Sequence, residues 1–336
     1  MARFDEVLKD CTKLGTKIPT SEYLKNGKYP IIDQGQSDTA GYYDSDGGLF
    51  ENVPAIVFGD HTRAVKYVDK PCFLGADGVK LLCPVDKNIN CKYLFYQLSC
   101  ADIPNTGYNR HFKWVKALDF KIPSSGEQNH VVEVLDKVTD LILIRQKQLA
   151  KLDELVKARF VELFYGQGYP VLKWKDVFDT TTGKLDANAA VENGTYPFFT
   201  CSKEVFRIDK YAFERKALLL AGNNAAGKYD VKYYNGKFNA YQRTYVLGLK
   251  ENWSYRLFQY QLEDKLEYLQ QQSLGGLTKY LTLKILGELD FIIPPKDKQD
   301  EFDTFVECAD QQKQTVQQSL EKLELMKKAL MQEYFG

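Results

Sequence analysis

The sequence of 336 residues has no apolar run that approaches the ~20 residues a helix needs to cross a bilayer. Its opening stretch, MARFDEVLKD, carries acidic side chains and lacks the apolar centre of a signal peptide. It also lacks net charge, because 45 Lys and Arg balance 45 Asp and Glu, so bulk electrostatics alone would not hold a nucleic acid. We therefore expect a soluble, cytoplasmic protein that makes no membrane contact.

Metal-binding and disulfide patterns are missing as well. None of the seven cysteines forms a Cys-x-x-Cys pair, the spacing typical of zinc sites and redox motifs. The three histidines, His61, His111 and His130, are isolated from one another and from any cysteine pair. We expect free thiols without a chemical role, and no metal ion.

The sequence lacks the motifs of the common catalytic classes. It has no Gly-x-Ser-x-Gly, no His-Glu-x-x-His, and no Asp-Pro-Pro-Tyr or Asn-Pro-Pro-Tyr of the amino-methyltransferases. Residues 222–229 approach a phosphate-binding loop, but Tyr229 stands where a magnesium-ligating Ser or Thr belongs. We interpret this stretch as a glycine-rich hairpin and expect no catalytic residue and no cofactor bound by the chain. A nucleoside-triphosphate enzyme built on this loop stays a rival hypothesis.

An internal repeat dominates what the sequence does contain. Residues 118–123 (LDFKIP) and 289–294 (LDFIIP) lie 171 residues apart, and the same offset relates Gln128 to Gln299. Looser matches upstream pair Tyr29-Pro30 with Tyr196-Pro197, and Tyr96-Gln97-Leu98 with Tyr260-Gln261-Leu262. The chain is therefore two copies of one unit, each a variable module followed by a helix.

A long proline-free helical segment follows each repeated hexapeptide. Ser125 with Gln128 three residues later predicts a capping box at the first helix. Apolar residues then recur in alternating steps of four and three, which is the heptad pattern of a coiled coil. Because both copies keep this period, we predict that the two helices pair with each other as an antiparallel coiled coil.

The predicted fold class is α+β, with two pseudo-symmetric α/β modules separated by the two long helices. Short β-like runs such as 55–58 and 217–220 alternate with Gly, Asn and Asp turns, and each module holds one helix-like stretch, at 91–100 and 255–271. The predicted boundaries are 1–124 for the first module, 125–166 for the first long helix, 167–295 for the second module and 296–336 for the second long helix.

Loops rich in basic, amide and aromatic residues are the candidate binding sites. Arg and Lys pair with guanine, Asn and Gln pair with adenine, and further basic groups hold phosphates. Two such loops in each module, without catalytic residues, favour nucleic-acid recognition. The candidate contact residues are Arg63, Lys66, Arg110, His111 and Lys113 in the first module, and Asn223, Asn224, Lys228, Gln242 and Arg243 in the second.

Three segments resemble a known family. Residues 58–82 (FGDHTRAVKYVDKPCFLGADGVKLL), residues 237–247 (KFNAYQRTYVL) and LDFKIP before a long helix are similar to the specificity subunits of type I restriction–modification enzymes, in an order that covers the whole chain. The resemblance implies two target recognition domains that each read one half of a bipartite sequence in double-stranded DNA. It implies that the helix pair sets the gap between the halves.

The same resemblance implies the partners of the chain. We expect two modification (methyltransferase) subunits, which bring S-adenosylmethionine and methylate adenine, and restriction or motor subunits, which use ATP with magnesium. The chain itself is then a non-catalytic subunit that binds none of these cofactors. The alternatives are the specificity subunit of a type IIB restriction–modification enzyme and a coiled-coil scaffold that binds no DNA.

Overall fold

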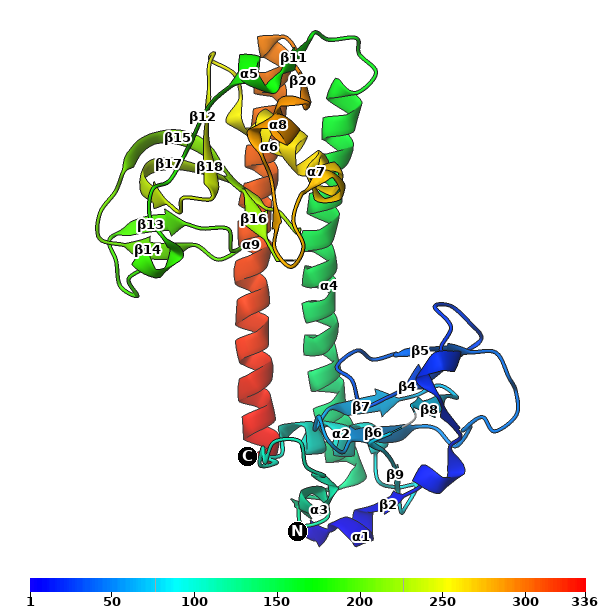
Figure 1. Ribbon diagram of the computed structural model, residues 1–336. Coiled ribbons are helices and arrows are strands. Elements are labelled where there is room, and N and C mark those ends of the chain that lie inside the picture. The colour runs from blue at the N-terminus through cyan, green and yellow to red at the C-terminus, as the bar shows by residue number, and fades with distance from the viewer. Residues whose placement is uncertain (76, 226) are drawn as a thin grey trace. The chain divides into compact units, whose positions relative to one another are not determined.

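The computed structural model describes residues 1–75, 77–225 and 227–336. These residues form two compact units, residues 1–146 with 318–336 and residues 147–317. Each unit holds one α/β module and a part of each of two long helices, α4 (Ser125–Phe164) and α9 (Lys296–Phe335) (Figure 1). The predicted fold class, α+β with two modules and two long helices, is confirmed.

The first module is built from two four-stranded sheets, ordered β2-β9-β6-β7 and β3-β8-β4-β5, and a short β1-β10 pair. All five residues of β6 (Ala55–Gly59) are buried, which fits a strand at the centre of the core. Its other elements are β1 (Ala2–Arg3), α1 (Phe4–Val7), β2 (Leu8–Asp10), β3 (Lys17–Ile18), β4 (Tyr29–Ile32), β5 (Gly41–Tyr43), β7 (Val65–Val68), β8 (Phe73–Gly75), β9 (Val79–Pro84), α2 (Cys91–Cys100), α3 (Phe112–Val115) and β10 (Asp119–Phe120).

The second module has one six-stranded sheet, ordered β12-β18-β15-β17-β13-β14, and two short pairs, β11-β20 and β16-β19. The helix predicted at 255–271 is two helices, because Lys265 separates α6 (Tyr255–Asp264) from α7 (Leu266–Gln272). The remaining elements are β11 (Val171–Lys173), α5 (Trp174–Val177), β12 (Phe178–Thr182), β13 (Tyr196–Phe199), β14 (Phe206–Ile208), β15 (Phe213–Ala221), β16 (Asn223–Asn224), β17 (Val231–Ala240), β18 (Thr244–Leu249), β19 (Lys279–Tyr280), α8 (Leu283–Gly287) and β20 (Asp290–Ile292).

The first unit shows how the two long helices run. Leu135, early in α4, is fully buried, and Leu330, late in α9, packs against the cluster that contains it. Farther along, the Arg145 guanidinium donates to the Ser319 hydroxyl at 3.1 Å. Residues early in α4 therefore contact residues late in α9.

The second unit completes the antiparallel pattern. Phe160, late in α4, belongs to the same buried cluster as Phe302, early in α9, with ring centroids 5.8 Å apart. The Lys313 ammonium lies 2.5 Å from the Asp153 carboxylate. In both units the helices pair in opposite directions, so the predicted antiparallel pairing is confirmed.

The capping box at the start of α4 lies one residue earlier than predicted. The Ser124 N–H donates to the Glu127 carboxylate at 3.0 Å, and the Glu127 N–H reaches the Ser124 hydroxyl at 3.4 Å. The prediction of Ser125 with Gln128 was therefore wrong, because Gln128 is engaged elsewhere.

The repeated glutamines join each long helix to its module. The Gln128 side chain accepts from the Asn90 N–H at 2.9 Å and donates to the Pro123 carbonyl at 2.9 Å. Gln299 repeats both bonds, accepting from the Ser254 N–H at 2.9 Å and donating to the Pro294 carbonyl at 2.9 Å. Asn90 and Ser254 are the N-caps of α2 and α6. The start of each long helix is thus fixed to the start of a module helix.

Loss of one of these glutamines has a measurable cost. We expect Gln299→Ala to lower the free energy of unfolding by about 1–3 kcal/mol, because a buried N–H and a buried carbonyl lose their partner. Chemical denaturation of the full chain measures this loss. Gln311→Ala is the matched control, since Gln311 is exposed on the same helix. Equal stability of the two variants would contradict the structural role of Gln299.

Candidate nucleic-acid interface

Two loops of the first module meet at Asp60 and His111. The His111 N–H donates to the Asp60 carbonyl at 2.8 Å, and the His111 Nδ1 lies 3.0 Å from the same oxygen. The Asp60 carboxylate accepts from the Phe112 N–H at 2.7 Å. His111 is fully buried, so it anchors the loop that precedes α3 to the end of β6 and presents no side chain to solvent.

Arg63 lies in the tight turn after β6. Its φ of 61° is in the left-handed region, which few residues with a side chain adopt. The guanidinium donates to the Ile103 carbonyl at 2.9 Å, and this bond ties the turn to the segment after α2. The side chain is half-buried, so part of it stays accessible at the meeting point of the two loops.

Lys66 is buried, whereas a residue that contacts DNA is expected to be exposed. Its side chain is 5% exposed, and its ammonium lies 3.2 Å from the Asp33 carboxylate. Arg110 and Lys113, by contrast, are exposed. Lys66 and His111 are therefore positioned behind the surface from which Arg110 and Lys113 project, and contact of any of these residues with DNA stays a prediction.

An exposed aromatic ring completes this surface and was not among the predicted residues. The Tyr108 and His61 rings are stacked, with centroids 4.7 Å apart and planes 9° apart. The His61 Nδ1 lies 3.2 Å from the Asn109 carbonyl, and Tyr108 is 87% exposed. An exposed aromatic ring held in this way can make an apolar contact with a base edge, such as the methyl group of thymine. In the sequence, Tyr108 lies between Gly107 and Asn109 in a polar loop, and this position could have identified it as an exposed contact residue.

The predicted residues of the second module come from three segments that the structure brings together. The Gly222 N–H donates to the Arg243 carbonyl at 2.8 Å, and the Leu281 N–H donates to the Gly222 carbonyl at 2.8 Å. In the β16-β19 pair, Asn223 lies opposite Tyr280. The loop after β15, the turn before β18 and the segment after α7 therefore form one surface.

The predicted side chains on this surface differ in exposure. Lys228, Gln242 and Arg243 are exposed, whereas Asn223 and Asn224 are half-buried. The Gln242 amide donates to the Asp186 carboxylate at 2.7 Å, and the Asn224 carbonyl oxygen of the side chain accepts from the Lys228 N–H at 3.2 Å. Basic and amide groups therefore gather here, as the prediction requires.

The glycine-rich stretch at 222–229 is a hairpin, as interpreted from the sequence. Antiparallel strands β15 and β17 flank it, with Leu220 opposite Val231. A phosphate-binding loop leads into a helix whose N-terminus faces the phosphates, but here strand β17 follows. Ala226 lies outside the described residues. The rival hypothesis of a nucleotide site on this loop finds no support in the described part of it.

The segment at 274–281 was missed by the sequence analysis. It carries Lys279 and Tyr280, and Leu277 is 96% exposed. The repeat offset of 171 residues relates Asn109 to Tyr280, and this relation was the signal that could have identified the segment. The backbone bonds agree with it to within one residue, because Leu281 bonds Gly222 as His111 bonds Asp60, whereas the offset pairs His111 with Thr282.

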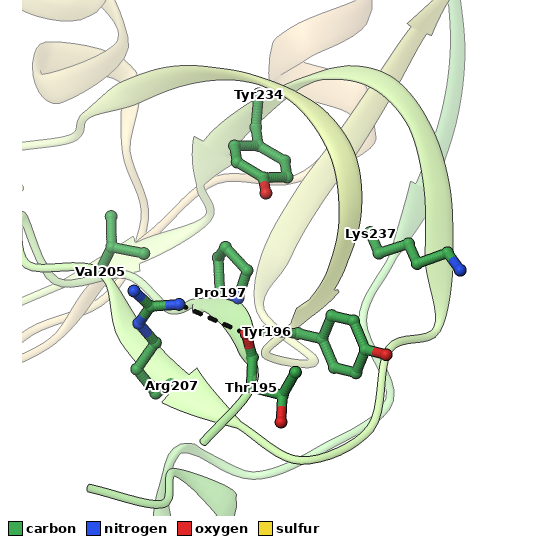
Figure 2. A pocket seen from close by; sticks show the side chains of 7 residues that line it. All are labelled: Thr195, Tyr196, Pro197, Val205, Arg207, Tyr234 and Lys237. Carbon is green, nitrogen blue, oxygen red and sulfur yellow. Dashed lines mark hydrogen bonds between the residues drawn. The ribbon is translucent and has the colours of Figure 1, made fainter. Parts of the chain in front are cut away.

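A hollow of about 590 Å³ lies on the outer strands of the second module. Figure 2 shows Arg207 directed toward the backbone of the neighbouring strand, and the Thr195 carbonyl accepts from its guanidinium at 3.4 Å. The second cation, Lys237, lies 3.7 Å from the Glu214 carboxylate and 4.8 Å from the Tyr211 ring centroid. Since both cations have partners within the module, we assign no ligand to this hollow.

The thiols and acidic groups of the described residues form no metal-binding cluster. Among the described residues, no group of three or more His, Cys, Asp and Glu side chains could hold a metal ion. Burial raises the pKa of Cys72, Cys83 and Cys91 to about 12, so these groups stay protonated thiols near neutral pH. The helices in the described ranges include none that is long and apolar enough to span a membrane.

Residues 4–154 and 167–325 each match the sequence profile of one protein family, described as the type I restriction modification DNA specificity domain. The chain belongs to this family. As a specificity-domain protein it carries the domain twice, once in each half of the internal repeat. The family resemblance of the three sequence segments is thereby confirmed.

Curated relatives within the family match part of the chain. The type I restriction enzyme EcoDI specificity subunit of Escherichia coli is 34% identical over 170 residues, which cover 47% of this chain and 37% of that protein. The EcoR124I/EcoR124II specificity subunit of Escherichia coli is 22% identical over 204 residues, which cover 54% of this chain and 50% of that protein. The matches therefore span half or less of these relatives' own length.

Solved structures share the fold over nearly the whole chain. The type I restriction–modification system S subunit from M. genitalium has a TM-score of 0.65 at 16% identity, covering 99% of this specificity-domain protein and 95% of that chain. A chain from a structural study of the assembly and conformational transition of the type I restriction–modification system has a TM-score of 0.53 at 14% identity. The match covers 98% of this chain and 97% of that chain. These likenesses establish a common architecture of two modules and two long helices.

Proposed function

We propose that this chain is the DNA specificity subunit of a type I restriction–modification complex, in which each module reads one half of a bipartite double-stranded target. One repeated observation carries the proposal. In both modules, the loop after the buried central strand is hydrogen-bonded to the segment before α3 or α8, through Asp60 with His111 and through Gly222 with Leu281. The same two-loop surface therefore occurs once per module, as a bipartite target requires.

The exposed side chains on these surfaces suit DNA bases and phosphates. Arg110 and Arg243 can donate two parallel bonds to guanine, and the Gln242 amide can pair with adenine. Lys113 and Lys228 are exposed cations suited to phosphate oxygens. Since these groups are few and the net charge is zero, partner subunits must share in closing around the DNA.

The proposal extends to those partners. Two modification subunits would supply S-adenosylmethionine and methylate adenine, and restriction or motor subunits would supply ATP and magnesium. The chain itself would then be a non-catalytic subunit. We place the complex in the cytoplasm. Apolar side chains that stay exposed on α4, including Leu143 at 47% and Ile144 at 48%, fit a helix face that docks a protein partner. The paired helices would set the gap between the half-sites.

Substitutions at Arg110, in the loop before α3, and at Lys113, in the first turn of α3, test the DNA assignment. We expect Arg110→Ala to cost about 1–3 kcal/mol of binding and to relax one base position, and Lys113→Ala to weaken all sequences alike and to lower the salt dependence. Competition binding with double-stranded oligonucleotides measures both. Lys87→Ala is the control, because Lys87 is exposed before α2, whereas the loop follows that helix. Unchanged affinity and sequence preference in both variants would contradict the assignment. If the wild-type chain, assembled with its partner subunits, binds no duplex, the alternative of a coiled-coil scaffold that binds no DNA would be favoured.

A further inference from the structure

A buried lysine of the first module holds a loop that lies outside the predicted contact segments. The Lys66 ammonium, on β7, donates to the Ser37 carbonyl at 2.5 Å and to the Asp33 carboxylate at 3.2 Å. Both partners belong to residues 33–38, the loop that follows β4. Burial of an ammonium is costly unless it is paired and hydrogen-bonded, so these bonds determine where the loop lies.

The second module repeats the arrangement. The Lys232 ammonium, on β17, donates to the Ser202 carbonyl at 2.9 Å and pairs with the Asp230 carboxylate. Ser202 belongs to residues 200–204, the loop that follows β13. Strands β7 and β17 are equivalent, because each pairs antiparallel with the buried central strand before it. Lys66 and Lys232 are therefore equivalent residues, and each is hydrogen-bonded to the equivalent loop of its own module.

In each module this loop also contacts the proposed reading surface. In the first module, the Gln34 side chain accepts from the His61 N–H at 3.3 Å, and the Gln34 carbonyl accepts from the Thr62 hydroxyl at 2.5 Å. In the second module, the Cys201 thiol donates to the Arg243 carbonyl at 3.4 Å. Two independent modules thus place the loop beside the residues proposed to meet DNA.

The loops carry exposed polar side chains that differ between the modules. Gln36, Ser37 and Asp38 are exposed in the first module, and Lys203 and Glu204 are exposed in the second. An amide such as that of Gln36 can bond adenine in two places, whereas a lysine suits guanine or a phosphate. A lysine holds the loop in both modules, whereas the exposed side chains of the loop differ. The residue that positions the loop is therefore separate from the residues that could contact bases.

We propose that residues 33–38 and 200–204 form a further recognition loop of each half-site, with Gln36 as a base-reading residue and Lys66 and Lys232 as positioning residues. This inference rests on the proposed function. Neither lysine touches DNA in this scheme. Each acts through the loop carbonyl that accepts its proton, so loss of the ammonium frees the loop without removing a reading group.

Selection from a random-sequence duplex library, with the full chain assembled with its modification subunits, tests the proposal. We expect Gln36→Ala to relax one position of the first half-site and to weaken the preferred duplex roughly 5- to 150-fold. Lys66→Met, which keeps the length of the side chain and removes its donors, is expected to relax several positions of the same half-site. Lys232→Met is expected to change only the other half-site, so each variant is an internal control for the other.

Two comparisons keep the outcomes distinct. Lys28→Met is the matched control, because Lys28 lies in the same module and forms an exposed ion pair with Asp46, and it is expected to leave both half-sites unchanged. Preserved first-half preference in both Lys66→Met and Gln36→Ala would overturn the inference and leave the proposed function standing. A wild-type assembly that selects no sequence would overturn the proposed function and the inference with it. If Lys66→Met fails to fold, Gln36→Ala on the exposed loop decides.

Discussion

Replacing Phe302 with alanine is expected to lower the free energy of unfolding of the second unit by about 3–5 kcal/mol. Phe302 is fully buried near the start of α9. Its ring centroid lies 5.3 Å from that of Phe164 at the end of α4 and 5.4 Å from that of Tyr260 on α6. The substitution would leave a cavity where three helices meet, and close-packed side chains could fill it only in part.

Denaturant unfolding of the full chain carrying Trp114→Phe, followed by the fluorescence of Trp174 and Trp253 in the second unit, measures this loss. Phe206→Ala is the matched control, because Phe206 lies in the same unit and is 38% exposed; its expected cost is within about 1 kcal/mol. Phe302→Leu is expected to fall between the two, since leucine fills part of the volume. A Phe302→Ala chain as stable as the Phe206→Ala chain would show that the three helices do not share a packed core.

The long helices could be predicted from sequence because their signals are local. These signals are the heptad spacing, the absence of proline and the repeated hexapeptide, and each depends only on residues close together in sequence. The helices that they predict are present in the structure. Gln128 shows the limit of such reasoning. Its repetition was visible, but its partner Asn90 is distant in sequence, so a local capping role was assigned in its place.

Lys66 shows the same limit at the candidate interface. A lysine between Val65 and Tyr67 in a strand indicates a solvent-facing position by alternation. In the structure Lys66 and Val68 form the buried face of β7, because residues 33–38 accept hydrogen bonds from the Lys66 ammonium and Val68 belongs to the buried cluster that contains Ile32 and Phe50. A covering loop from another part of the chain leaves no mark on the pattern of the strand, whereas the exposed loop with Arg110 is polar throughout and could be identified.

The second module was predicted less completely because one of its segments carries little charge. Residues 274–281 read LGGLTKYL, and composition alone gives them no binding role. Their place beside Asn223 depends on the β16-β19 pair, a contact between residues distant in sequence. Only the repeat, applied residue by residue, could have brought them into the candidate surface.

Inserting one heptad into each long helix, after Leu149 in α4 and after Val316 in α9, is expected to lengthen the nonspecific gap of the DNA target and to leave both half-sequences unchanged. The bonds of Arg145 with Ser319 and of Asp153 with Lys313 bracket these two positions. Seven residues preserve the heptad seam and add roughly 10 Å at about 1.5 Å per residue. With base pairs stacked about 3.4 Å apart, the gap should grow by about three base pairs.

Sequencing of methylated adenines in cells that produce the chain and its modification subunits reads both half-sequences and the gap together. The control is a four-residue insertion after Leu149 in α4 alone, which shifts the seam of one helix against an unchanged partner. We expect this unpaired insertion to abolish methylation or to change the gap irregularly, because apolar positions lose their opposite neighbours. Altered half-sequences with an unchanged gap in the matched variant would show that the modules, and not the paired helices, determine the spacing.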